Sequence, residues 1–549
     1  MDINNIFNYY SNDGDGSFNP YKRNTEGFEF PIGSKYGTCM LEDGLVWTAF
    51  KNNSLCSGGS TYTHGLQAGK ILVNGTSSHP PVADDPGNTA NRIYRVRPDM
   101  RPTSDSGKVA SETKVLNRAE MPYFNRSGIS SRMTVSELLN QYWSDWNEWP
   151  ANEGAPFTDA SGVVHPNGGS GYNPSTCTPG FPGTDQTQWC VMNDMDTSRT
   201  LGLYASDPIG IEVQRTIWAY NCGGGLGNTI FISYRFINKS GAELDSMYVS
   251  QWADPDVGYP GDDAVGCDTT LNLGYAYNAV PYDQSYTGEL DSPPPAVGFE
   301  LLQGPIVPGT ASDTATWNMG KIAGKKNLPM TSYFFSCGGS SIFADPYLYT
   351  PDGTLQWYNV MRGLTTIDGL PLTASVTGGS KYCYAGDPVT NTGQTFIGSG
   401  TVAVPGDICV YINSGPFTMM PGDTQQVVLA AIAGIGKDYL QSIYVLKKNS
   451  YDAEVAFRNA LNMTTVPSPT TPVSSANNAG GAILVQWGNE AESFTQSRYL
   501  FEGYNVYQLS SPIASKEGSR LIATFDKIDG VTSLDGYELD PATGKVVLE

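Results

Sequence analysis

Histidine is scarce in this chain, which has only His64, His79 and His165 among 549 residues. All three stand in turn-like contexts such as "SSHPP" and "VVHPN", and their spacing is not that of metal ligands. A serine or cysteine nucleophile would need one of them as its base. The sequence also lacks the GxSxG, HExxH, Walker and dinucleotide motifs. Nucleophilic, zinc-protease and nucleotide-dependent enzymes are therefore disfavoured.

Positive charge is also in short supply. Lys and Arg number 32 against 54 Asp and Glu, so the formal net charge is −22. Such a chain repels nucleic acid and anionic lipid surfaces unless a basic patch opposes the repulsion, and the basic clusters near Arg92–Arg101 and Lys325–Lys326 are modest. The longest mostly apolar run, Val427–Gly436, is about half of a bilayer span. We expect no nucleic-acid partner and no membrane insertion.

Short β-type runs punctuated by Gly, Pro, Asn or Asp fill most of the chain, which contains 62 Gly and 36 Pro. They predict a mainly β protein of antiparallel β-sandwich domains with a few helices. The segment Thr229–Asp254 contains two apolar-alternating runs joined by "NKSGAE", and Phe417–Gly434 repeats this design around Pro421-Gly422. Both segments are typical of strands joined by a hairpin-style loop.

Four regions follow from the pattern. They are an N-terminal β-rich region (1–133), a large β-sandwich region (134–462), a Pro/Ser/Thr/Asn linker (463–481) and a partial fibronectin type III-like domain (482–549). Helices are expected near 134–149 and 437–461, the second broken near Asn449-Ser450. In the first, Thr134 and Glu137 form a capping box, and one face carries Leu138, Tyr142 and Trp146.

Nine cysteines bear on the compartment. The N-terminal "MDINNIFNYYSNDGDG" lacks a basic and then apolar leader, which normally indicates the cytoplasm. Against this stand two close pairs, which predict the disulfides Cys39–Cys56 and Cys177–Cys190. We therefore expect an extracellular or cell-surface protein, with one cysteine left over because the number is odd.

The acidic stretch "QWADPDVGYPGDDAVGCD" is the candidate site. It holds five aspartates and no Lys, Arg or His: Asp254, Asp256, Asp262, Asp263 and Asp268. The negative charges of these carboxylates repel one another unless the carboxylates stay solvated, share protons or bind a cation. A Ca²⁺ loop, a solvated or hydrogen-bonded loop and a catalytic carboxylate group all remain open. The EF-hand spacing fails here and also at "SNDGDG", Ser11–Gly16.

Sugar hydrolysis by paired acids also stays open, because the two carboxylates come from distant positions in the sequence. Trp143, Trp146 and Trp149 could then line a sugar platform, although a hydrophobic helix face with one exposed Trp is the preferred interpretation.

Several longer segments carry a family resemblance: "LGNTIFISYRFINKSG", "QWADPDVGYPGDDAVGCDTTLNLGYAYN", "PPPAVGFELLQGPIVPG", "SGPFTMMPGDTQQVVLAAIAG" and "FEGYNVYQLSSP". With these, the chain from about Ile3 to Glu549 resembles uncharacterised secreted proteins of Bacteroidota and Ignavibacteria that carry fibronectin type III modules and a type IX secretion sorting domain. The resemblance implies export, a surface location and further β-sandwich modules downstream. It implies no reaction. The sequence departs from the pattern by ending inside the module, without the sorting domain.

Two functional hypotheses follow. The first is an extracellular structural or adhesive protein, a subunit of a fibre, filament, layer or other surface assembly, with self-association or other surface proteins as partners and glycans as further candidate ligands. It rests on the resemblance, on the sandwich pattern and on the last module, which is too short for its usual seven or so strands. The second is a secreted hydrolase of glycans or peptides with appended β-sandwich modules.

Overall fold

The computed structural model describes residues 1–20, 26–34, 37–101, 135–338, 340, 342–397, 404–459, 474–479, 482–493, 495–496, 499–501, 503–508, 520–527, 537–539 and 546–548. The chain divides into two compact units, one of residues 1–461 with 536–549 and one of residues 462–535. Thr134 of the expected capping box and much of the expected linker lie outside the described residues.

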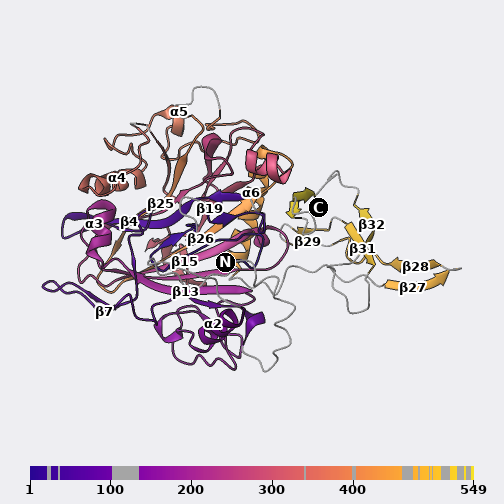
Figure 1. The fold of residues 1–549 in the computed structure, drawn as a ribbon, viewed down its shortest axis with the longest axis horizontal. Coiled ribbons are helices and arrows are strands. Elements are labelled where there is room, and N and C mark those ends of the chain that lie inside the picture. The colour runs from indigo at the N-terminus through magenta and orange to yellow at the C-terminus, as the bar shows by residue number, and fades with distance from the viewer. Residues whose placement is uncertain are drawn as a thin grey trace. The chain divides into compact units, whose positions relative to one another are not determined.

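Two large antiparallel sheets form the first unit, which confirms the mainly β fold (Figure 1). The six-stranded sheet has the order β1 (Asp15–Gly16), β4 (Glu42–Lys51), β16 (Leu244–Asp254), β25 (Ile408–Met419) and β24 (Ser332–Cys337), with β5 (Ser54–Gly59) on β4. The nine-stranded sheet has the order β17 (Asp263–Asp268), β18 (Leu273–Asn278), β19 (Ala296–Gln303), β26 (Thr424–Gly434), β15 (Thr229–Asn238), β14 (Ile211–Ala219), β13 (Gln186–Asn193) and β6 (Gln67–Ala68), with β9 (Tyr94–Val96) on β13.

Several smaller antiparallel sheets are separate from these two. They are β2 (Phe28–Glu29) with β3 (Thr38–Met40), β7 (Ile71–Val73) with β8 (Val82–Ala83), β10 (Phe157–Thr158) between β11 (Val164–His165) and β12 (Thr178–Pro179), β20 (Ile306–Pro308) with β23 (Lys325–Asn327), and β21 (Thr314–Trp317) with β22 (Gly320–Ala323).

The two large sheets face each other, and each is covered on its outer face by a helix. Trp47 on β4 meets Phe236 on β15 edge to face, with ring centroids 5.4 Å apart. The next residue, Thr48, points the other way and donates to the sulfur of Met361 at the end of α4 (Pro351–Met361). On the nine-stranded sheet, α6 (Tyr439–Arg458) packs against β26, β19 and β18. Both faces of β26 are buried, which is why apolar residues occupy consecutive positions from Val427 to Ile432.

The helices agree with the sequence pattern, apart from one detail. α2 (Val135–Asn147) buries Leu138, Tyr142 and Trp146 on one face, as expected. Trp149 is also buried and Trp143 is half-buried, so core packing is the role of these tryptophans. The expected break in the last helix is wrong, since α6 runs through Asn449 and Ser450. The remaining helices are α3 (Thr197–Tyr204), α5 (Ala374–Thr377), the 3-10 turns η1 (Pro98–Met100), η3 (Ala151–Glu153), η4 (Gly225–Asn228) and η5 (Pro260–Asp262), and the π-helical η6 (Gln284–Leu290).

Asn449 and Ser450 do not interrupt α6 because their polar side chains are used for packing. Asn449 Nδ2 donates to the backbone oxygen of Ala433 at 2.8 Å, and Ser450 Oγ donates to a carboxylate oxygen of Glu300 at 2.7 Å.

No helix among the residues described is long and apolar enough to cross a membrane.

The two predicted hairpins are also wrong, although their strands are present. β15 pairs with β14 and β26, while β16 pairs with β4 and β25. β15 and β16 therefore lie in different sheets, and so do β25 and β26. Each connecting loop crosses from one sheet to the other instead of turning within one sheet. The local sequence of a crossing loop and of a hairpin loop is similar, so only the pairing partners distinguish them.

Asn238, at the end of β15, holds the two crossings together. Its fully buried side-chain amide donates to the backbone oxygens of Ala242 at 2.9 Å, Met419 at 3.0 Å and Met420 at 3.1 Å. Its backbone N–H donates to Asp423 O at 2.9 Å. The Asn238 side chain thus donates hydrogen bonds to backbone carbonyl groups of both loops. These carbonyl groups lie where the strands end and would otherwise have no hydrogen-bond donor.

The domain boundaries of the structure differ from the expected regions. β4, β6 and β9 come from the first 133 residues and join the same sheets as strands from residues 186–434, so these strands belong to one compact unit. In the second unit the described strands pair as β27 (Ser474–Ala479) with β28 (Ala482–Trp487), β29 (Thr495–Gln496) with β30 (Tyr499–Leu500), and β31 (Gly503–Gln508) with β32 (Arg520–Asp526). The pair β33 (Tyr537–Leu539) and β34 (Val546–Leu548) belongs to the first unit.

Replacing Asn238 by Ala should lower the free energy of unfolding by about 3 kcal/mol, because several buried carbonyls lose their donor at once. Urea unfolding followed by tryptophan fluorescence measures this loss. The exposed Asn147 on α2 provides the control, and Asn147→Ala should change stability by less than about 0.5 kcal/mol. Equal effects of the two substitutions would contradict the role of Asn238.

Candidate cation site

Two segments far apart in the sequence bring carboxylates together at one end of the six-stranded sheet. β16 ends at Asp254 and β25 begins at Ile408. The two strands are antiparallel, with Ala253 opposite Val410, so the end of β16 lies beside the start of β25. The residues just outside this ladder therefore meet. One ligand oxygen from each of Asp254, Asp256 and Asp407 lies within 4.8 Å of the others.

Asp254 lies in the buried part of this group. Tyr62 donates its hydroxyl to Asp254 Oδ2 at 2.8 Å, and the thiol of Cys409 lies 3.7 Å from Oδ1. Burial raises the pKa of Asp254 to about 7. Burial, followed by the charge of Asp254, also keeps the pKa of the Cys409 thiol well above its usual range. Cys409 therefore stays a neutral thiol and is a poor ligand beside the carboxylate oxygens.

Asp256 is held more firmly by its backbone than by its side chain. Its N–H donates to Cys39 O at 3.0 Å, which fixes the loop against β3. Its side chain is only 6% exposed, and within the described part of the chain no hydrogen bond to its carboxylate is found. Burial, and then the charges of Asp254, Glu26 and Asp407, raises its pKa to about 8. Asp256 is thus a buried carboxylate whose near neighbours are acids.

Asp407 supplies the exposed side of the group. Burial and then the charge of Asp345 raise its pKa above the ordinary value. Three carboxylates that converge without an ion pair to Lys, Arg or His among the described residues favour either shared protons or a hard cation. Calcium suits such a site, since it takes about six to eight oxygen ligands in flexible geometry and accepts carbonyls and water beside carboxylates.

The other three aspartates of the predicted site are not members of this group. Asp262 accepts from Asn278 Nδ2 at 3.2 Å, and burial raises its pKa to about 6. Asp263 is fully buried, accepts from Val257 N at 3.1 Å and has a pKa raised by burial. Asp268 lies 3.2 Å from Lys447 Nζ. Burial opposes its charge, but hydrogen bonds from Thr270 and the Lys447 ammonium together lower its pKa.

Of the five predicted residues, the structure brings Asp254 and Asp256 together, and it adds Asp407, which the sequence analysis did not name. Asp407 stands in "VPGDICVYIN", where an acid follows Pro-Gly and precedes an apolar strand. The same combination of acid, Pro and Gly at a strand boundary surrounds Asp256. Only the pairing of β16 with β25 brings Asp256 and Asp407 together, and the sequence pattern does not show which strands pair.

The four cysteines expected in disulfides are free in the structure. Cys39 lies in β3 with its sulfur 2.9 Å from the hydroxyl of Tyr286, while Cys56 lies in β5. Cys177 precedes β12 and Cys190 is in the middle of β13. Neither Cys39–Cys56 nor Cys177–Cys190 is formed in the structure, and the four buried thiols pack as small apolar side chains. The extracellular location loses the support of these pairs.

The pKa shifts predict how stability depends on pH without metal. Asp254 and Asp256 hold protons up to about pH 7 and 8 in the folded state, whereas an unfolded aspartate releases its proton near about pH 4. The folded state therefore binds more protons across this interval, and stability falls as the pH rises. Urea unfolding of metal-free protein at pH 5 and pH 8 should show lower stability at pH 8.

Asp256→Asn should flatten this slope and should stabilise the metal-free protein at pH 8 by about 1 to 3 kcal/mol, because it removes a buried charge. Other buried acids contribute to the slope of both proteins, so the difference between the variant and the wild type is the informative quantity. Asp207, which is exposed, is the control, and Asp207→Asn should leave the slope unchanged. Parallel pH profiles for wild type and Asp256→Asn would contradict the raised pKa.

Comparison with known proteins adds little to this geometry. No protein-family model matches the chain, and no curated protein is significantly similar to it. Among solved structures, the crystal structure of Pichia pastoris lysyl oxidase PPLO is similar at 9% sequence identity and a TM-score of 0.25, over 90% of this chain and 56% of that one. The chain thus spans about half the length of that protein. Likeness at this level carries no conclusion about fold or function.

Proposed function

We propose that this chain is an extracellular structural or adhesive protein of a cell-surface assembly, and that its β core binds calcium at Asp254, Asp256 and Asp407. The buried carboxylate of Asp256, surrounded by acids and without a hydrogen bond among the described residues, is the observation that carries the proposal. A divalent cation would balance these charges, with backbone carbonyls and water completing its shell.

The position of this group favours a structural role for the cation. A metal held by Asp254, Asp256 and Asp407 would join the end of β16 to the start of β25. Calcium sites of extracellular modules bind with dissociation constants of about 10⁻⁴ to 10⁻³ M, which suits a site of three carboxylates with one of them exposed. Secretion itself remains a proposal that rests on the sequence resemblance.

Exposed apolar side chains in the second unit support assembly. Leu484 and Val485 on β28 are 49% and 46% exposed, and Leu521, Ile522 and Phe525 on β32 are 50–52% exposed. Trp487 links these strands through edge contacts to Tyr504 and Phe525, with ring centroids 5.7 and 5.2 Å apart. Apolar surface of this kind normally marks a contact with another protein. Self-association of the chain through β28 and β32 would cover it.

Calcium should raise the melting temperature of metal-free protein at pH 8, because it binds the folded state alone. The gain is about 2.7 kcal/mol when free calcium is 100 times its dissociation constant. Differential scanning fluorimetry with and without chelator, combined with elemental analysis, measures the effect. Asp256→Asn and Asp407→Asn should abolish it.

Asp262→Asn is the matched control, since it removes the same charge from the same acidic stretch outside the group of three. This variant should keep the full calcium response. An unchanged melting temperature in the wild type, with no calcium in the protein, would contradict the proposal.

The hydrolase alternative rests on the pKa values of about 7 and 8, which suit a general acid at neutral pH. The hydrolase hypothesis would be favoured if the wild type hydrolysed a glycan or a peptide and Asp254→Asn lost this activity.

Assembly is tested separately by placing charges on the exposed apolar strands. The double variant Leu484→Lys, Leu521→Lys should dissociate the assembly, because each lysine would be buried in the contact. Light scattering of the full chain gives the particle mass. Leu370→Lys, at an equally exposed leucine of the first unit, should leave the mass unchanged. A wild-type chain that remains monomeric at high concentration would contradict self-association.

A further inference from the structure

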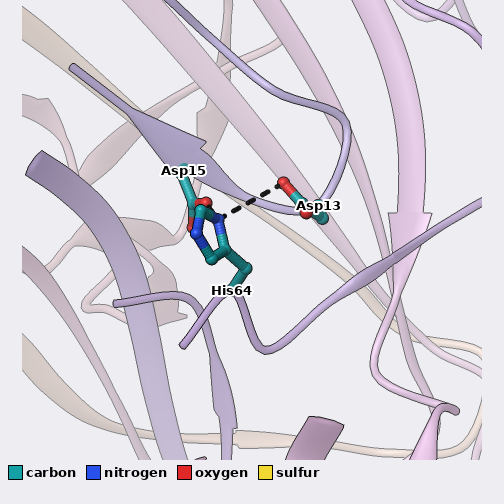
Figure 2. Close-up of side chains that lie close together, drawn as sticks. All are labelled: Asp13, Asp15 and His64. Atoms are coloured by element: carbon teal, nitrogen blue, oxygen red, sulfur yellow. Dashed lines mark ion pairs between the residues drawn. The ribbon is translucent and has the colours of Figure 1, made fainter. Parts of the chain in front are cut away.

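A second group of metal-ligand side chains lies in the first unit and comes from segments outside the acidic stretch that contains Asp254. Asp13, Asp15 and His64 offer one ligand atom each, and these atoms lie within 4.8 Å of one another. Figure 2 shows the imidazole of His64 facing both carboxylates. Two of the ligands come from "SNDGDG", which fails as an EF-hand, and the third is a histidine that the sequence places in an isolated turn.

The backbone explains why these residues converge. Asp15 lies in β1, opposite Gly44 of β4. Gly14 has φ +108°, and a Cβ there would lie 2.6 Å from Ser60 Cβ, so only glycine lets "DGD" approach the loop after β5. His64 itself has φ +51°, which is uncommon for a residue with a side chain. The two segments are thereby pressed together.

The atoms that face each other are all acceptors unless a proton or a cation lies among them. His64 Nδ1 contacts Asp15 Oδ2 and is 3.8 Å from Asp13 Oδ1. His64 and Asp15 are 5% and 1% exposed, and neither His64 Nδ1 nor Asp15 Oδ2 has a hydrogen bond within the described part of the chain. These two buried atoms thus have each other as ion-pair partners, and an imidazole nitrogen that faces a carboxylate oxygen can share a cation as well as a proton.

The other carboxylate oxygens are held from outside. Ser60 donates its hydroxyl to Asp15 Oδ1, and Arg199 Nη1 lies 3.2 Å from Asp13 Oδ2. Arg199 also donates to the backbone oxygen of His64 at 3.1 Å, which ties the histidine loop to the same guanidinium. Outer hydrogen bonds that orient the ligands in this way are typical of metal sites.

We infer that Asp13, Asp15 and His64 form a site for a borderline divalent cation such as Zn²⁺, separate from the proposed calcium site. A proton on Nδ1 could be donated to one carboxylate at a time, whereas a metal ion would engage all three ligand atoms. Imidazole nitrogen together with carboxylate oxygen suits zinc, while calcium prefers oxygen alone. Three protein ligands leave a fourth position of a tetrahedral zinc for water or a further ligand.

Equilibrium dialysis of chelator-stripped full-length protein against ZnCl₂, followed by elemental analysis, tests the inference. The wild type should retain one tightly bound zinc per chain. His64→Gln and Asp15→Asn should each weaken zinc binding by at least about tenfold, because each removes one of three ligands. Circular dichroism of the same samples shows whether the variants are folded, and Asp15→Asn preserves the shape of its side chain.

His165→Gln is the matched control, because His165 also forms an ion pair with an aspartate, Asp159 at 3.1 Å, and lies outside the group. It should bind zinc like the wild type. Asp256→Asn should also keep its zinc, which separates this inference from the calcium proposal. A wild type that retains no zinc, or folded His64→Gln that binds zinc as tightly as the wild type, would overturn the inference.

Discussion

The sandwich depends on the place where the chain passes twice between its sheets. Asn238 bonds to both crossing loops, and its position at the end of β15 sets how far β15 and β26 overlap. The same crossings start β16 and end β25, so these two strands become neighbours in the opposite sheet. At the far end of that pair Asp254 meets Asp407. The candidate cation site is thus a consequence of how the chain crosses between the sheets.

The local features of this fold could be predicted from the sequence, and its pairings could not. Alternating apolar residues identified β15, β16, β25 and β26, and the helical spacing of Leu138, Tyr142 and Trp146 identified α2. These patterns report which faces of an element are buried. They do not report the strand opposite, so the crossings were predicted as hairpins and Asp407 was missed. The disulfide prediction failed for the same reason, since two cysteines that are close in the sequence need not have their sulfur atoms close in space.

Buried carboxylates are numerous in this acidic chain, and their surroundings differ. Asp194 accepts hydrogen bonds from the backbone N–H groups of Ile209, Gly210 and Ile211 at 2.8–3.2 Å, so it is a structural acid held by main-chain donors. Among the described residues, Asp256 has no such donors and has acids for neighbours. This contrast is the reason why the calcium proposal is placed at Asp256 and not at Asp194.

The crossings also determine when the core can close during synthesis. β15 and β16 emerge early, but the strands that pair with them inside the sandwich, β25 and β26, follow much later, with 155 positions between Asp254 and Cys409. Contacts between such distant positions form slowly, because a long loop must close first. A growing chain therefore leaves one edge of β15 and one edge of β16 unpaired until Gly434 has appeared. Unpaired strand edges of this kind favour aggregation until their partner strands arrive.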